Sequence, residues 1–151
     1  ADLEVTCASL NQILERSLGG GCYVSINKSI VTQASAAIPA VPLYMSLLFD
    51  VMKRAGTHEG PLEQAERLLS DHVGPGRKPS TDVEGRIRLD DLEMAPAVQA
   101  EVLELWSKVT TERLAEWGSF GRFQRYFRQC FGFDVPGVDY ARPVETDLGW
   151  D

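Results

Sequence analysis

The chain has 151 residues, 44% of them hydrophobic and 25% charged, with a formal net charge of −7. This composition is typical of a globular domain with its own core, and the acidic charge argues against nucleic acid as a partner. No apolar segment approaches the roughly 20 residues of a membrane-spanning helix. The three scattered cysteines lack metal-binding or redox spacing, which predicts no metal site and a reducing, cytoplasmic location. We expect His58 and His72 to be surface or turn residues.

The first predicted element is a helix over residues 2–18, because leucine and isoleucine recur there at helical spacing and three glycines follow. Residues 22–26 favour extended backbone and predict a short strand. A helix followed by a strand is half of a βαβ unit, but no partner strand is evident in this sequence. We therefore expect a fragment of a larger α/β domain, with the missing strands supplied by a preceding stretch of the same polypeptide.

The rest of the chain is predicted to be almost entirely helical. Hydrophobic periodicity, with glycine or proline at several boundaries, predicts helices over residues 43–54, 61–73, 95–109, 111–117 and 120–131. Residues 80–91 are predicted to form a charged loop or short hairpin. The sequence from residue 134 onward is irregular and ends in an acidic tail.

The segment after the predicted strand is the sharpest functional signal. Residues 31–35, Val-Thr-Gln-Ala-Ser, follow the carboxyl end of a strand, where ligands of open parallel sheets bind. Small side chains let the backbone approach a cofactor, and the Thr32 hydroxyl and nearby N–H groups can bind a carboxamide or a phosphate. The alternative is a tight turn in which small residues are needed only for packing.

Residues 23–52, YVSINKSIVTQASAAIPAVPLYMSLLFDVM, resemble the trans-2-enoyl-CoA reductases and the FabV-type enoyl-acyl-carrier-protein reductases. Further matching segments follow in the family's order, at residues 58–60, 84–88, 98–102, 105–106, 109–111, 131–133 and 137–140. Members are NADH-dependent relatives of the short-chain dehydrogenases that reduce the 2,3 double bond of enoyl thioesters. The resemblance implies the C-terminal portion of a Rossmann-type α/β domain with a parallel sheet, mostly helical within this chain.

The resemblance also implies how the chain is divided and what it binds. Residues 1–55 would be the last αβ unit, the cofactor loop and the substrate-pocket helix, and residues 56–151 a helical cap with an acidic tail. Ile30, Val31 and Thr32 match the segment that contacts NAD, with Thr32 hydrogen-bonded to the cofactor and the other two beside the nicotinamide. The implied partners are an enoyl thioester of coenzyme A or acyl-carrier protein, and the N-terminal remainder of the polypeptide.

The helix after this loop carries a candidate pocket face and a misleading pair. Leu43, Leu47 and Val51 share one face, which the resemblance matches to the acyl pocket, with plain core as the alternative. Tyr44 and Lys53 have the Tyr-x8-Lys spacing of the family's catalytic pair. However, nine residues make two and a half turns, so these side chains point to opposite faces. The family's own pair precedes the segment matching the start of this chain, so we assign no catalytic residue and expect the chain alone to be inactive.

Two charged segments offer alternatives. Residues 80–91 fit an EF-hand register, with Asp82 and Glu84 at ligand positions, which would make the chain a non-catalytic, calcium-binding helical module. However, Ser80 replaces the first aspartate, Asp91 replaces the bidentate glutamate, and two arginines oppose a cation. A solvated turn rich in ion pairs is the competing interpretation.

The last predicted helix interleaves arginines with phenylalanines. Phe120, Phe123, Phe127 and Phe131 recur at helical spacing and predict a buried face, whereas the arginines lie on another face. A core helix therefore explains the pattern better than a binding site for single-stranded nucleic acid.

Overall fold

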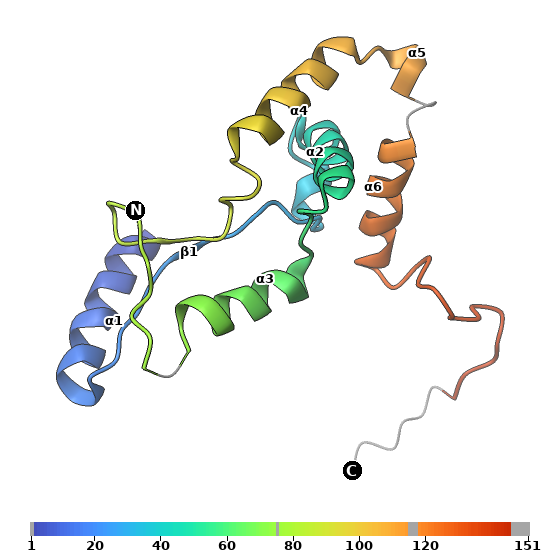
Figure 1. Ribbon diagram of the computed structural model, residues 1–151. Helices are drawn as coiled ribbons and strands as arrows, with labels where there is room; N and C mark the ends of the chain where they lie inside the picture. Colours follow the sequence, from blue (N-terminus) through green and yellow to red (C-terminus); the bar gives the residue numbers. More distant parts are fainter. Residues whose placement is uncertain (1, 75, 115–117, 146–151) are drawn as a thin grey trace.

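The computed structural model describes residues 2–74, 76–114 and 118–145, and shows several helices and a small two-stranded parallel sheet (Figure 1). Helix α1 (Asp2–Leu18) has the predicted bounds and is followed by Gly19 at φ 63°. It buries none of its side chains. Its exposed large apolar residues are Leu3, Val5, Leu10, Ile13 and Leu18.

The sheet contains a strand that the sequence did not reveal. Strand β1 (Ser25–Ile26) pairs in parallel with β2 (Ile87–Arg88), so the expectation that no partner strand lies in this chain was wrong. Residues 80–91 therefore contribute a parallel strand and not a hairpin. Two residues are too few to leave a periodic pattern, and β2 lies in a segment rich in charged residues.

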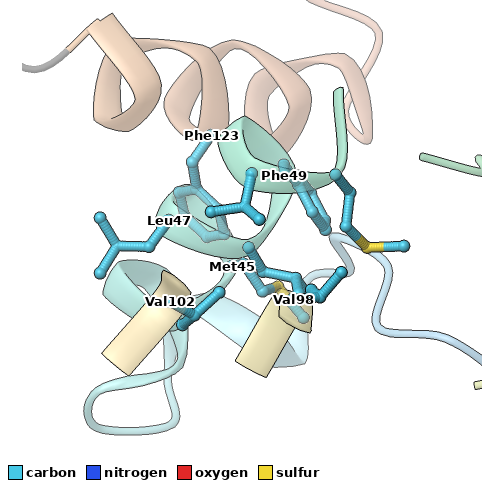
Figure 2. Close-up of a cluster of buried hydrophobic side chains, with 9 residues drawn as sticks. Met45, Leu47, Phe49, Val98, Val102 and Phe123 are labelled. Carbon is cyan, nitrogen blue, oxygen red and sulfur yellow. The ribbon is translucent and has the colours of Figure 1, made fainter. Parts of the chain in front are cut away.

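Helix α2 (Val41–Ala55) lies at the centre of the packed region (Figure 1). Gly56 ends the helix in the left-handed region at φ 71°, which glycine adopts without steric cost. Helices α4 (Pro96–Lys108) and α6 (Gly118–Gln129) both pack against it. Figure 2 shows the resulting core, whose buried residues are Met45, Leu47, Leu48, Phe49, Val51, Met52, Val98, Val102 and Phe123.

The connecting elements are short. Helix α3 (Pro61–Arg67) continues as a π-helical turn over Leu68–His72, where the sequence predicts a single helix. A 3-10 turn spans Ala34–Ala36, and α5 (Thr111–Leu114) is one turn long. The remainder of the predicted helix 111–117, and the end of the acidic tail, lie outside the described residues.

The aromatic face of α6 is buried only in part. Phe123 is in the core and Phe127 packs against it, but Phe131 is half exposed. The predicted buried face is therefore correct at the middle of the helix and wrong at its end. In the described part of the chain, no helix combines the length and apolarity needed to cross a membrane.

The cysteines are free thiols, as expected, but two of them are neighbours in space. Cys7 on α1 and Cys22 in the segment before β1 place their Sγ atoms 3.6 Å apart. Their separation of 15 residues along the chain concealed this contact.

Candidate functional site

A cavity of about 470 Å³ lies next to the loop that follows β1. Its walls come from this loop, α2, the start of α3 and the end of α6, and the lining residues are 28–31, Phe49, 58–61, Glu63, Tyr126 and 129–130. The volume is within the range of small-molecule binding sites. The position matches the general rule that ligands bind beyond the carboxyl ends of parallel strands.

A buried carboxylate fixes the loop that forms one wall. Glu93 accepts hydrogen bonds from the Ser29 backbone N–H at 2.6 Å, the Ser29 hydroxyl at 2.9 Å and the Tyr44 hydroxyl at 2.7 Å. Gln99 donates to the Tyr44 oxygen and to the Glu93 carbonyl. Burial, reinforced by the Glu93 carboxylate, raises the pKa of Tyr44 to about 12, so this hydroxyl keeps its proton.

Lys28 places a cation in the wall of the cavity. Its side chain is only 1% exposed, its ammonium donates to the Ser29 carbonyl at 2.9 Å, and it lies 4.3 Å from the centre of the Phe49 ring. Burial lowers the pKa of Lys28 to about 8, although the Glu93 and Glu59 carboxylates oppose the change. The ammonium is therefore mostly protonated at neutral pH.

His58 lines the same cavity. It follows the end of α2, as expected of a turn residue, but its buried Nδ1 has no hydrogen-bond partner among the described residues and its ring meets Phe49 edge-on at 4.8 Å. Burial and the positive charges of Lys28 and Lys53 lower the pKa of His58 to about 4, so the imidazole is neutral at pH 7. The expectation of an ordinary surface or turn histidine therefore missed its place in the site.

The predicted cofactor residues divide into two groups. Ile30 and Val31 line the cavity, whereas Thr32 is not among its lining residues. Thr32 forms a compact turn with Ser35, whose hydroxyl donates to the Thr32 carbonyl at 2.6 Å and whose N–H donates to the Thr32 hydroxyl at 3.3 Å. The hydrogen bonds between Thr32 and Ser35 therefore stabilise the conformation of this loop, in addition to any role of the Thr32 hydroxyl in binding.

The predicted acyl-pocket face lies in the interior. Leu47 and Val51 are core residues, and Leu43 packs against the core. None of the three lines the cavity described here. The structure therefore displays the core packing of this face, and its contact with an acyl chain stays a prediction.

The two members of the misleading Tyr-x8-Lys pair have different partners. Tyr44 bonds to Glu93, whereas the Lys53 ammonium contacts the hydroxyl of Tyr126 on α6. The inference that these two side chains do not act together is consistent with these separate contacts.

The EF-hand-like loop is closed by its own arginines. Asp82 accepts hydrogen bonds from the Arg86 backbone N–H at 2.9 Å and from its guanidinium at 3.0 Å, and these bonds lower the pKa of Asp82. Arg88 pairs with Asp90 at 2.6 Å. No group of acidic, histidine or cysteine side chains in the described ranges could hold a metal ion. Residues 80–91 thus contain a turn held by ion pairs, and the described residues give no support to the alternative of a calcium-binding loop.

Comparison with known proteins assigns both halves of the chain to one kind of enzyme. A family model described as "Trans-2-enoyl-CoA reductase catalytic region" matches residues 1–73, and one described as "Enoyl reductase FAD binding domain" matches residues 81–144. An NADH-dependent enoyl-acyl-carrier-protein reductase of Opitutus terrae is 47% identical over 97% of this chain. A protein of the same name from Burkholderia pseudomallei is 50% identical over 97%.

Solved structures agree with the sequence relatives. The trans-2-enoyl-CoA reductase of Clostridium acetobutulicum in complex with NAD is 40% identical and covers 97% of this chain with a TM-score of 0.89. That of Treponema denticola, also with NAD, is 38% identical and covers 90% with a TM-score of 0.79. The chain spans about 37% of the length of the Opitutus relative and 38% of the Clostridium structure.

Proposed function

Because the chain belongs to the family of trans-2-enoyl-CoA reductases and NADH-dependent enoyl-acyl-carrier-protein reductases, we propose that it forms part of such an enzyme. The reaction is the reduction of the 2,3 double bond of a trans-2-enoyl thioester in fatty acid synthesis. The chain spans little more than a third of its relatives, so the activity belongs to a longer polypeptide that includes these residues.

The cavity beside β1 is the observation that carries the proposal. Its walls combine apolar side chains, Ile30, Val31 and Phe49, with a few polar groups that have free hydrogen-bonding capacity. This combination suits the nicotinamide end of a dinucleotide, which is a flat ring with polar substituents. When bound, NADH supplies a hydride for C3 of the substrate.

The residues of this chain have positioning roles in that reaction. Ile30 and Val31 pack beside the nicotinamide and exclude water, while the Thr32 hydroxyl hydrogen-bonds the cofactor. Leu43, Leu47 and Val51 share the helix face that lines the acyl pocket. A tyrosine and a lysine outside this chain act on the thioester carbonyl and the ribose, as the family resemblance implies.

NADH and not FAD is the proposed cofactor. The relatives' names specify NADH, and the structures of Clostridium and Treponema contain NAD. Among the described residues of the segment whose family description mentions FAD, Tyr126, Gln129 and Cys130 line the cavity. The proposal therefore includes no flavin step.

The partners follow from the same reasoning. The substrate is an enoyl thioester of coenzyme A or acyl-carrier protein, and the uncovered apolar side chains of α1 pack against the N-terminal remainder of the polypeptide. The three free cysteines suit a reducing cytoplasm.

A spectrophotometric assay tests the proposal. The full-length polypeptide that carries this chain is expected to oxidise NADH in the presence of crotonyl-CoA and to release butyryl-CoA. The isolated 151 residues are expected to be inactive, because the proton donor lies outside them. Failure of the full-length protein on enoyl thioesters of both carriers would refute the proposed activity, and turnover by the isolated chain would refute the division of roles.

A further inference from the structure

Lys28 carries a positive charge that no ion pair neutralises among the described residues. Its ammonium has three N–H donors, of which one bonds to the Ser29 carbonyl. The ammonium also lies over the Phe49 ring, 4.3 Å from the ring centre, and this cation–π contact supplies a weak electrostatic attraction. No hydrogen-bond partner among the described residues takes its other N–H donors, and Lys28 lines the cavity.

The nearby carboxylates are already occupied. Glu93 accepts its three hydrogen bonds from uncharged donors. Glu59 forms an ion pair with Arg67 at 2.8 Å, and Glu63 accepts from the Gly60 N–H at 3.0 Å. None of these carboxylates is ion-paired with the ammonium, although Glu93 and Glu59 attract it from a distance.

His58 places an unpartnered polar atom in the wall of the same cavity. Its buried Nδ1 has no partner in the described part of the chain, and the ring is neutral because burial and the charges of Lys28 and Lys53 hold its pKa at about 4. A neutral imidazole nitrogen can accept or donate one hydrogen bond, according to its tautomer. The wall of the cavity therefore combines a charged donor with a neutral imidazole.

A buried, unpaired cation is costly for a protein to keep, and such groups gather at functional sites. We propose that the Lys28 ammonium, assisted by His58, binds a negatively charged oxygen of the reactants. That oxygen belongs to a phosphate of the cofactor or to the thioester, where negative charge develops during hydride transfer to C3. The proposal rests on the function proposed above and adds a residue to its site.

Replacing Lys28 by methionine separates the two sources of the oxygen. In the full-length polypeptide, Lys28→Met is expected to cost about 10- to 100-fold, the range for losing one hydrogen bond to a charged group. If the oxygen belongs to a phosphate, the Kd for NADH, measured by nicotinamide fluorescence, rises by that factor. If it belongs to the thioester, kcat falls by that factor and the Kd for NADH is unchanged.

Controls distinguish binding from folding and from the proposed function itself. Lys28→Arg keeps the charge and is expected to recover part of the loss in NADH affinity or kcat. The control Lys78→Met, at an exposed lysine, is expected to leave both quantities unchanged. Calorimetric titration with inorganic pyrophosphate tests the phosphate source without turnover. A Lys28→Met enzyme that keeps wild-type Kd and kcat overturns the proposal while leaving the activity established. A wild-type protein that neither turns over nor binds NADH or pyrophosphate overturns both.

Discussion

The unpaired charge of Lys28 predicts that its removal stabilises the protein. Lowering the lysine pKa from 10.5 to about 8 corresponds to about 3 kcal/mol of folding free energy at pH 7. Lys28→Met recovers this cost but loses the hydrogen bond to the Ser29 carbonyl and the contact with Phe49, which together offset about 1 kcal/mol. We therefore expect the free energy of unfolding to rise by about 2 kcal/mol.

The pH dependence identifies the cause. Below pH 8, Lys28 is protonated in both the folded and the unfolded states, so the advantage of the methionine variant is constant. Between about pH 8 and 10.5 the unfolded chain binds more protons than the folded one, and the wild type therefore gains stability as the pH rises. The advantage of Lys28→Met consequently shrinks over this interval and is lost within it.

Urea unfolding followed by circular dichroism, at pH 7 and at intervals up to pH 10.5, measures both effects. Lys78→Met is the matched control, because this exposed lysine lacks the buried environment. A Lys28→Met protein that is less stable than wild type at pH 7 would refute the reasoning. So would an advantage that does not change between pH 8 and 10.5.

Three further predictions concern groups around the site and on α1. Glu93→Ala removes the acceptor of three buried hydrogen bonds and is expected to lower the free energy of unfolding by about 3 kcal/mol, whereas a loss below about 1 kcal/mol would show that the loop does not depend on it. Wild-type stability is expected to fall as the pH drops from 6.5 through about 4, because unfolded His58 binds a proton that the folded residue resists; His58→Phe should flatten this dependence, and equal slopes would contradict it. Oxidised glutathione is expected to link Cys7 to Cys22, with loss of two hydrogens by mass and two electrons passed to glutathione; separate glutathione adducts without a cross-link would contradict the geometry.

Local signals predicted the elements with strong patterns. The bounds of α1 follow from regular apolar spacing and a glycine cluster, and α2 ends where Gly56 adopts a positive φ. The predicted cofactor loop follows a strand and resembles a known family. Its Ile30 and Val31 line the cavity, and their contact with NAD stays a prediction.

The remainder of the site depends on contacts between distant segments. Glu93 accepts a hydrogen bond from Ser29, which lies 64 residues away in the sequence, and no motif around either residue predicts this contact. The charge of Lys28 is ordinary in sequence and becomes unusual only after burial against Phe49. Strand β2 could not be predicted, because it pairs with β1 through a tertiary contact and leaves no local alternation of apolar and polar residues in the sequence.

Hydrogen–deuterium exchange with and without NADH tests most directly whether the cavity beside β1 is the cofactor site. In the full-length polypeptide, NADH is predicted to slow exchange of the backbone amides of residues 29–31 and 58–60, which line the cavity. The amides of α4, which lie outside the cavity lining, serve as the internal reference. Protection of both lining segments relative to α4 is the predicted result. Tight NADH binding that leaves residues 29–31 and 58–60 unprotected would contradict the account.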